Sequence, residues 1–453
     1  MPSSAQHPEQ SAIDFMEMEF NPEDFELDSR RYHSREFKKQ EDRAIWFRTW
    51  QVACRLDELP KAGDWIEHSI IDQSYVIVRG EDGEVRAFHN ACRHRGNQLC
   101  HGKGNSTSIT CPFHLWQYNL DGSLKHVSDA ETFIAFDKRD YGLVPISCGH
   151  WGGFVFVNPD ANAEPLDDYL APIREILAPY HLEQMVPTGL NCVQRIECNW
   201  KVGIDAFSES YHVQGIHPQN LPISNDIERR HLFLGRHRLF VAPWGSASPR
   251  LGDIDPDETV EAFGVLEKVF KGPDAGNSME DMVAIYRNED GIIDFPEGVT
   301  IRSLSQDGVR ASAAATGQDI SGLTDGQLVD NYNFLIFPNT TINVRANDMT
   351  MFKFMPDPKG DPEVSLFEAV TYQLITDPAE AEARRKPRAT ISGEQSMGFV
   401  IDQDREMMPR QQVGLRSRGL EKLILSRQEI ALIHFHQQVD REIAEFGGEQ
   451  ADA

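Results

Sequence analysis

The sequence predicts an α+β protein with a small all-β module followed by a larger mixed domain. From about residue 63, short β-like runs such as "SYVIVRG" are separated by turns, and Asp82-Gly83 has the chemistry of a hairpin turn. Farther along, "NFLIFPNTTINVRANDMTMFKFMP" and "EVSLFEAVTYQLI" alternate like paired strands of an antiparallel sheet. We therefore expect three parts: an N-terminal arm and helix over 1–45 that packs with the larger domain, an all-β domain over 46–160, and the larger domain over 161–453.

The larger domain is expected to contain both helices and strands. Residues 190–203 have the pattern of a strand, and residues 204–214 that of a helix ending at a glycine and a proline. The Gly-, Asp- and Ser-rich stretch 245–330, with one helix expected near 258–271, is expected to be an insertion or a lid. A long amphipathic helix is expected over 419–446.

The composition excludes several classes of partner. A net charge of −27 over 453 residues provides neither the basic surface that nucleic acid needs nor attraction to an anionic membrane. No apolar run approaches the roughly 20 residues of a membrane span, and the polar start carries no export signal. Seven cysteines, an odd number, fit a reducing cytoplasm better than a disulfide framework. We expect a cytoplasmic protein that binds neither nucleic acid nor membranes.

The strongest chemical signal is a pair of short loops that each offer one cysteine and one histidine. The all-β module contains Cys92-Arg-His94 and, farther on, Cys111-Pro-Phe-His114. Two thiolates and two imidazoles suit a [2Fe–2S] centre with both cysteines on one iron and both histidines on the other. The alternative is a structural zinc site, but zinc usually pairs Cys-x2–4-Cys with His-x3–5-His, whereas here each loop mixes the two residue types.

A second constellation lies in "DAFSESYHVQGIHP". On a continuous helix, Asp205, Glu209 and His212 would share one face, and a bend after the helix would let His217 reach the same point. Two histidines and one carboxylate leave open positions for O2 on a non-haem Fe(II) ion. The other histidines have no such neighbours, and His436 on the terminal helix is expected to be structural or solvent-facing.

Both constellations resemble Rieske non-haem iron oxygenases, specifically their α subunits. The quoted motifs are "CRHRG…CPFHLWQYNLDGSL" and "NWKVGIDAFSESYHVQGIHP". The chain departs from the family pattern at Leu115, where Gly usually follows the histidine, and at Asp205-Ala206, where Glu-Asn is common. The resemblance implies a Rieske domain and a catalytic domain of the helix-grip type, with an antiparallel sheet covered by helices.

The resemblance also implies the third ligand of the mononuclear iron. The family places this carboxylate on a helix ahead of a Gln-x-Gly-Leu segment, which is Gln412-Val413-Gly414-Leu415 here. Asp404 fits the family spacing best, and Asp402 is the alternative. Either aspartate could instead cap this helix.

Glu209 receives a different role from the resemblance. In the family, the corresponding acid hydrogen-bonds an iron-ligating histidine, here His212. It also bonds a cluster-ligating histidine of a neighbouring subunit, here His114, and so bridges the electron path in a head-to-tail homotrimer. Many members that act on aromatic rings have Asp at this position, whereas Glu is frequent in branches that act on alkylammonium substrates.

The function implied is that of the terminal oxygenase component of a multicomponent system. The chain has no Gly-rich dinucleotide fingerprint, so electrons from NAD(P)H would arrive through a separate reductase, ferredoxin or both. We expect a homotrimer, with or without a small β subunit, that uses O2 to hydroxylate an aromatic or other hydrophobic small molecule. The alternative is O- or N-demethylation or alkylammonium oxidation. An electron carrier without oxygenase activity would leave His212 and His217 unexplained.

Overall fold

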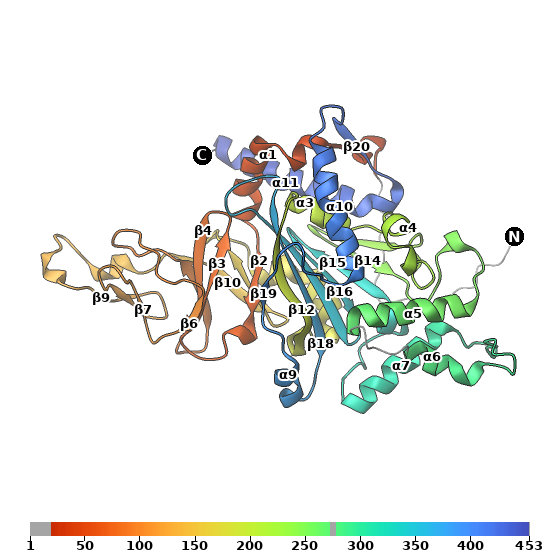
Figure 1. The fold of residues 1–453 in the computed structure, drawn as a ribbon. Coiled ribbons are helices and arrows are strands. Elements are labelled where there is room, and N and C mark those ends of the chain that lie inside the picture. The colour runs from red at the N-terminus through yellow and green to blue at the C-terminus, as the bar shows by residue number, and fades with distance from the viewer. Residues whose placement is uncertain (1–19, 272–277, 453) are drawn as a thin grey trace. The chain divides into compact units, whose positions relative to one another are not determined.

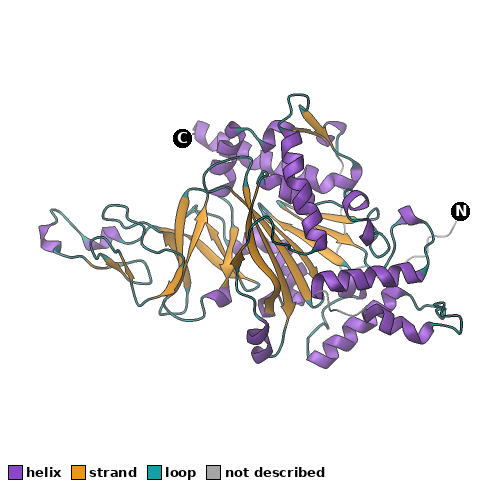
Figure 2. Cartoon of the chain, viewed as in Figure 1, coloured by secondary structure: helices purple, strands orange, loops and turns teal. Residues whose placement is uncertain are grey.

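The computed structural model describes residues 20–271 and 278–452, and it confirms the expected α+β class (Figures 1 and 2). The described residues form two compact units. The first consists of 20–34, 172–355 without 272–277, and 362–440, and the second of 35–171, 356–361 and 441–452. Most of the N-terminal arm, residues 1–19, lies outside the described residues. None of the described helices combines the length and the apolar character that crossing a membrane requires.

The second unit is built on antiparallel sheets. A seven-stranded sheet has the order β2-β11-β10-β5-β4-β3-β6, and a three-stranded sheet has the order β7-β8-β9. The hairpin turn expected at Asp82-Gly83 joins β4 to β5, and Gly83 takes the positive φ of 86° that such a turn requires. The strands are β2 (Gln51–Arg55), β3 (Asp64–Ile70), β4 (Gln73–Arg79), β5 (Val85–His89), β6 (Lys103–Asn105), β7 (Ile109–Thr110), β8 (Gln117–Tyr118), β9 (Leu124–His126), β10 (Pro145–Trp151) and β11 (Phe154–Asn158).

The first unit is built on an eight-stranded sheet of order β13-β14-β15-β16-β17-β18-β12-β19. The strands that were expected from the alternating pattern form its centre, and β15, β16 and β17 follow one another as antiparallel neighbours. The strands are β12 (Met185–Ile196), β13 (Arg230–Leu234), β14 (His237–Ala242), β15 (Asn331–Ile336), β16 (Thr340–Arg345), β17 (Asp348–Pro356), β18 (Ser365–Leu374) and β19 (Ala389–Thr390). A separate two-stranded sheet pairs β1 (Glu26–Asp28) with β20 (Lys422–Ile424).

Helices accompany this larger sheet. Figure 1 shows α3 and α10 running beside each other, and α5, α6 and α7 forming a group of their own. Gly203 of α3 lies so close to the ring of Phe354 on β17 that helix and sheet are in direct contact. The helices of the first unit are α3 (Trp200–Ala206), α4 (Val213–Ile216), α5 (Pro256–Lys271), α6 (Ser278–Val283), α7 (Ile301–Thr316), α8 (Asp325–Val329), α9 (Pro378–Arg384) and α10 (Phe399–Leu415). The second unit contains α1 (Arg35–Glu41), and the residues of α2 (Leu166–Leu177) and α11 (Ile430–Asp452) are divided between the two units.

Two expectations about the middle of the chain are wrong in part. The strand expected over 190–203 ends at Ile196, because Asn199 caps α3 by accepting a hydrogen bond from the backbone N–H of Lys201. The segment 245–330, in which one helix was expected, contains the expected helix as α5 and also the helices α6 to α8. Its polar composition reflects helix caps such as Thr300, which starts α7, as well as loops.

The terminal helix is also shorter than expected at its start. Lys422–Ile424 forms β20 and pairs with β1, and α11 begins only at Ile430. Hydrophobic spacing over 419–446 did not distinguish the three-residue strand from a helical turn, because the partner strand lies near the other end of the chain.

Candidate metal centres

The helix expected over 204–214 is interrupted. The helix α3 ends at Ala206, and α4 has only four residues, Val213–Ile216. His212 immediately precedes α4 and His217 immediately follows it, so the short helix holds the two imidazoles at its two ends. The interruption matters because the expected stripe of Asp205, Glu209 and His212 on one helix face does not exist.

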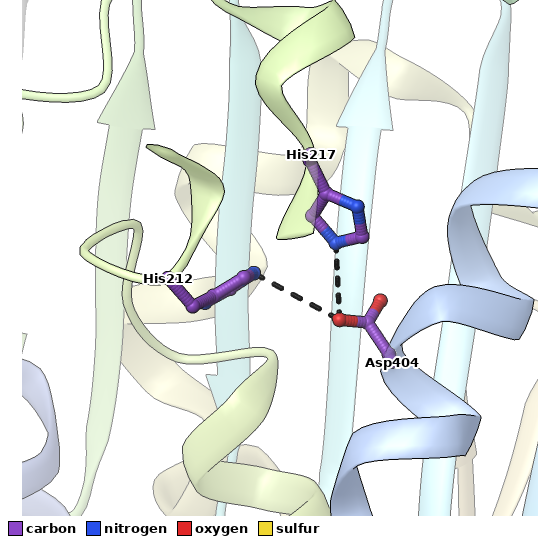
Figure 3. A group of neighbouring side chains, drawn as sticks. All are labelled: His212, His217 and Asp404. Carbon is purple, nitrogen blue, oxygen red and sulfur yellow. Dashed lines mark hydrogen bonds and ion pairs between the residues drawn. The ribbon is translucent and has the colours of Figure 1, made fainter. Parts of the chain in front are cut away.

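Three side chains converge in the first unit: His212, His217 and Asp404 (Figure 3). One donor atom from each lies within 4.8 Å of the others. Nε2 of His217 is 3.0 Å from Oδ1 of Asp404, and Nε2 of His212 is 3.9 Å from the same oxygen. Asp404 comes from α10 and is 187 residues from His217 in sequence. His217 and Asp404 are almost completely buried, so the group faces the protein interior.

The other ring nitrogen of each histidine has an acceptor of its own. Nδ1 of His212 lies 2.6 Å from Oε1 of Glu209, and Nδ1 of His217 lies 2.9 Å from Oε1 of Gln403. An amide oxygen only accepts, so Nδ1 of His217 donates to Gln403, and its Nε2 faces Asp404. Two imidazole nitrogens and one carboxylate oxygen form a donor set that suits Fe(II).

Electrostatics around His212 favour positive charge. Burial opposes protonation of the ring, but the carboxylates of Glu209 and Asp404 outweigh it and raise the pKa of His212. The alternative carboxylate, Asp402, is directed elsewhere: it accepts hydrogen bonds from the backbone N–H of Met397 and from the hydroxyl of Ser396, in the first turn of α10. The structure therefore brings Asp404 into the group and leaves Asp402 in a capping position.

Glu209 lies in the turn between α3 and α4 rather than on a helix. One carboxylate oxygen bonds His212 Nδ1, and the other accepts from the backbone N–H groups of Tyr211 and His212. Its side chain is 9% exposed. The turn thus fixes the carboxylate beside the histidine and outside the metal group.

Asp205 points away from the iron group, into a buried network. Its carboxylate accepts a 2.7 Å hydrogen bond from the hydroxyl of Tyr32 and lies 3.2 Å from Nε2 of His436. His436 is fully buried, and burial lowers its pKa although Asp205 acts in the opposite direction. Gln412 bonds the backbone carbonyl of Tyr32 and the backbone N–H of Asn199, and so ties α10 to the start of α3.

Gln403, Tyr32 and His436 are site neighbours that sequence reasoning missed. Gln403 directly precedes Asp404, and a polar residue next to a metal-binding carboxylate was the one available signal. Tyr32 and His436 are 404 residues apart and meet only in the folded chain.

The Cys/His loops of the second unit are also brought together. Cys92 and Cys111 are 3% and 1% exposed, and the rings of His94 and His114 lie 4.6 Å apart. Nδ1 of His94 is buried without a hydrogen-bond partner among the described residues. Burial raises the pKa of Cys92, and the hydroxyl of Tyr118 lies 3.3 Å from its sulfur. A ring nitrogen without a hydrogen-bond partner beside two buried thiols fits a metal-binding role for these residues.

The types of these donors bear on the choice between one ion and a cluster. Two thiols and two imidazoles, with one of each in each loop, suit a two-iron cluster better than a single zinc ion. Leu115, which replaces the usual Gly, has a positive φ of 60°, so this loop adopts at Leu115 a conformation that glycine takes without strain.

Fold and donor sets together define a protein with an Fe–S domain and a mononuclear non-haem iron domain. The chain belongs to the ring-hydroxylating alpha subunit family, whose catalytic domain matches residues 178–445, more than half of its 453 residues. The Rieske [2Fe–2S] domain matches residues 49–137. These matches confirm the family inferred from the motifs.

The curated relatives include enzymes for different substrates. The carnitine monooxygenase oxygenase subunit of Escherichia coli (strain K12) is 32% identical over 248 residues, 53% of this chain and 65% of the relative. The glycine betaine monooxygenase oxygenase subunit of Pseudomonas aeruginosa (strain UCBPP-PA14) is 35% identical over 201 residues, covering 44% and 45%. The biphenyl 2,3-dioxygenase subunit alpha of Rhodococcus jostii (strain RHA1) is 32% identical over 194 residues, covering 41% and 42%. The chain thus matches less than two thirds of the length of each.

Solved structures share the fold along nearly the whole chain. A quaternary ammonium Rieske monooxygenase, described in connection with carnitine oxidation, has a TM-score of 0.66 at 23% identity and covers 92% of this chain and 94% of its own. Naphthalene 1,2-dioxygenase from Rhodococcus sp. has a TM-score of 0.63 at 18% identity, covering 93% and 94%. At these identities the likeness concerns the fold alone.

Proposed function

We propose that this chain is the oxygenase subunit of a multicomponent monooxygenase that oxidises a quaternary ammonium compound. The observation that carries the substrate class is the identity of 32–35% to oxygenase subunits named for carnitine and glycine betaine. The sequence had favoured an aromatic substrate and kept alkylammonium oxidation as the alternative, and the comparisons favour that alternative. Glu209 is consistent with it, because Glu at this position was the sequence feature that pointed toward alkylammonium substrates.

We further propose a role for each site residue. The proposed cluster ligands are Cys92, His94, Cys111 and His114, in a Rieske domain over 46–160. The proposed iron ligands are His212, His217 and Asp404, in a catalytic domain over 161–453. The donor types suit these groups. Cys92, Cys111, His217 and Asp404 are buried, whereas the other three histidines are partly exposed.

The residues around the iron group prepare it for oxygen chemistry. When bound, the two cofactors supply electron transfer and O2 activation, so that a C–H bond becomes C–OH and the second oxygen atom leaves as water, with two electrons and two protons consumed. Glu209 accepts a hydrogen bond from Nδ1–H of His212, and the amide oxygen of Gln403 accepts one from Nδ1–H of His217. Both imidazoles are thereby kept in the tautomer that directs Nε2 to the metal.

We also propose that the electrons come from a separate reductase and cross between subunits. The chain would form a head-to-tail homotrimer in which the carboxylate of Glu209 bonds both His212 of its own chain and His114 of the neighbouring chain. The support within this chain is that the carboxylate of Glu209 already makes two hydrogen bonds with His212, one with its ring and one with its backbone N–H, and accepts a third from the backbone N–H of Tyr211.

A substrate panel with isotopic oxygen tests the proposed function. The purified chain, loaded with iron and supplied with a reductase and NADH, is incubated under 18O2 with carnitine, glycine betaine, biphenyl and benzoate. We expect one 18O atom in an aldehyde released from a quaternary ammonium substrate, because hydroxylation beside a cationic nitrogen leads to C–N cleavage. The Asp404→Ala variant should lose this turnover and keep the visible absorption of the cluster.

Two results would contradict the proposal. Incorporation of two 18O atoms into biphenyl with no turnover of either betaine would restore the aromatic substrate. Turnover that survives in Asp404→Ala would show that this carboxylate is not a ligand of the working iron.

A further inference from the structure

Three basic side chains in and beside the β13–β14 hairpin contain buried nitrogen atoms that lack a hydrogen-bond partner among the described residues. They are Nη1 of Arg229, Nδ1 of His231, and both Nε and Nη2 of Arg238. Arg238 has no exposed surface, whereas Arg229 and His231 remain partly exposed. Buried N–H groups of native proteins nearly always have an acceptor, so this set asks for one that the described residues do not provide.

The three side chains surround a single aromatic ring. His231 lies directly opposite Phe240 in the antiparallel register, and Phe233 lies opposite Arg238, so all of them project from the same face of the sheet. The guanidinium carbons of Arg229 and Arg238 are 5.7 and 5.1 Å from the centre of the Phe240 ring, and the ring of His231 is 5.9 Å away. We call these three residues the basic cluster.

The basic cluster is connected to the turn that carries the iron group. Nη1 of Arg238 donates a 2.7 Å hydrogen bond to the side-chain oxygen of Asn333. The amide nitrogen of Asn333 donates in turn to the backbone carbonyl of Phe207, where α3 ends and the turn toward Glu209 begins. The charge of Arg229 also acts on the ring of His212. The basic cluster therefore faces the same interior region as the iron group.

The acids near the basic cluster are already engaged. Those whose charges act on its arginines are Asp205, Glu209, Asp226 and Asp330. Asp226 accepts hydrogen bonds from Ser248 at 2.5 Å and from Arg250 at 2.7 Å, and Asp330 is bonded by Arg302. Asp205 and Glu209 are held by the partners described above. The charges of these carboxylates act on the two arginines, but none of the carboxylates accepts a hydrogen bond from the four nitrogen atoms.

We propose that the basic cluster binds the carboxylate of the substrate, which would make the substrate a betaine, an acid that contains a quaternary ammonium group. The quaternary ammonium group of this substrate rests on the proposed function, whereas its carboxylate is inferred from the basic cluster. The nitrogen atoms Nε and Nη2 of Arg238 form one edge of the guanidinium, and two parallel N–H groups on one edge match the two oxygens of a carboxylate. Nη1, on the other edge, is occupied by Asn333.

The charge state of the basic cluster agrees with this role. Burial lowers the pKa of Arg238 to about 9 and that of Arg229 to about 10, so both remain cationic at neutral pH. Burial, assisted by the two arginines, lowers the pKa of His231 to about 3, which leaves the imidazole neutral and able to donate from one nitrogen. An incoming carboxylate would meet two cations and one neutral donor.

Direct binding measurements test the proposal without turnover. Dissociation constants of glycine betaine, carnitine and γ-butyrobetaine, and of their methyl esters, are measured by calorimetry on the metal-loaded protein in the absence of reductant. We expect Arg238→Gln and Arg229→Gln each to weaken the three acids by roughly 10- to 100-fold, the effect of losing a hydrogen bond to a charged group. The esters should change by less than about twofold. Arg238→Lys should recover part of the loss.

The matched control is Arg345→Gln, because Arg345 is on the same sheet and is paired with Asp348. It should bind the acids as the wild type does.

Loss of the cluster absorption would show that the Arg238→Gln variant does not fold. In that case the affinity of Arg229→Gln for the acids tests the proposal, because Arg229 is partly exposed. Wild-type affinity for the acids in Arg229→Gln, or esters and acids that bind the wild type equally, would overturn the proposal. Betaines that bind through the arginines and are never oxidised would overturn the proposed function and leave this site standing.

Discussion

At the scale of single residues, each iron-facing histidine is oriented through its far nitrogen. For His217 this role belongs to Gln403, whose amide oxygen lies 2.9 Å from Nδ1. Replacement of Gln403 by Leu removes the acceptor and frees the imidazole to rotate. We expect iron affinity to fall by about 10- to 100-fold, the usual cost of losing such a partner. Iron retained against graded chelator, measured by elemental analysis, gives the affinity.

The neighbouring Gln411 provides the control for this prediction. It is on the same helix and points into solvent, so Gln411→Leu should retain iron as the wild type does. Unchanged iron retention in Gln403→Leu would show that the packing of α4 alone orients His217.

His231 makes acid stability testable, because its pKa is lowered from 6.5 to about 3 by burial and then by Arg238 and Arg229. The folded chain keeps His231 neutral, whereas the unfolded chain takes up a proton below pH 6.5. Its contribution to stability is therefore complete above pH 6.5 and is lost as the pH falls toward 3. Between pH 7.5 and 5.5 the wild type should lose about 1.4 kcal/mol more unfolding free energy than His231→Gln does.

Urea titrations of both proteins at the two pH values measure this difference. Equal losses of unfolding free energy in wild type and variant would mean that His231 is protonated in the folded protein. Its buried Nδ1–H would then need a hydrogen-bond acceptor.

The residues of the site differ in how far the sequence alone could predict them. The spacings Cys-x-His, Cys-x2-His and His-x4-His mark donors that lie close along the chain, so these residues could be proposed from sequence. The histidine pair gained its metal role only because the Cys/His loops precede it. Asp404 needed the family pattern, because 187 residues separate it from His217. Tyr32 and His436 had no local signal at all. A buried tyrosine becomes a hydrogen-bond donor to Asp205 only once both ends of the chain have packed against α3.

At the scale of elements, the close approach of α3 to the sheet depends on one glycine. A Cβ at Gly203 would overlap the ring of Phe354, whereas a Cβ at Gly414 of α10 has nothing within 4 Å. We expect Gly203→Ala to destabilise the fold by about 1–3 kcal/mol through overpacking. The same change at Gly414 should be neutral or stabilise by up to about 1 kcal/mol, because Ala is the better helix former.

Urea midpoints followed by circular dichroism compare the two variants. Because α3 leads into the turn that holds Glu209 and His212, Gly203→Ala should also reduce iron content, and Gly414→Ala should leave it unchanged. Equal stability of the two variants would mean that the ring of Phe354 moves aside without cost.

The elements that sequence patterns described poorly share a physical cause. Strands with alternating side chains were expected and found in β15 to β18, since a two-residue period reports burial on one face. The division of 204–214 into α3, a turn and α4 was missed, because helical spacing persists across a turn stabilised by side-chain contacts. Those contacts are made by Glu209, whose carboxylate accepts the backbone N–H groups of Tyr211 and His212, and no periodicity encodes them.

At the scale of the whole molecule, the proposed electron route predicts that turnover requires two neighbouring chains. If Glu209 connects His212 to His114 of a neighbouring chain, each iron depends on the cluster of another subunit. A chain without a cluster (His114→Ala) and a chain without iron (Asp404→Ala) should each be inactive alone. Co-expressed and isolated as mixed trimers, they should recover about a third of wild-type turnover, because one of the three directed interfaces in a ring that contains both variants is complete.

Turnover of the co-purified mixture, with each variant carrying a different affinity tag, measures the recovery. Mixing the separately assembled proteins serves as the control and should yield no activity as long as subunits do not exchange. A mixed assembly that remains inactive, although both variants are present in it, would mean that electrons pass from cluster to iron within one chain. Glu209→Gln would then slow transfer only through its own His212, and the proposed bridge between subunits would be wrong.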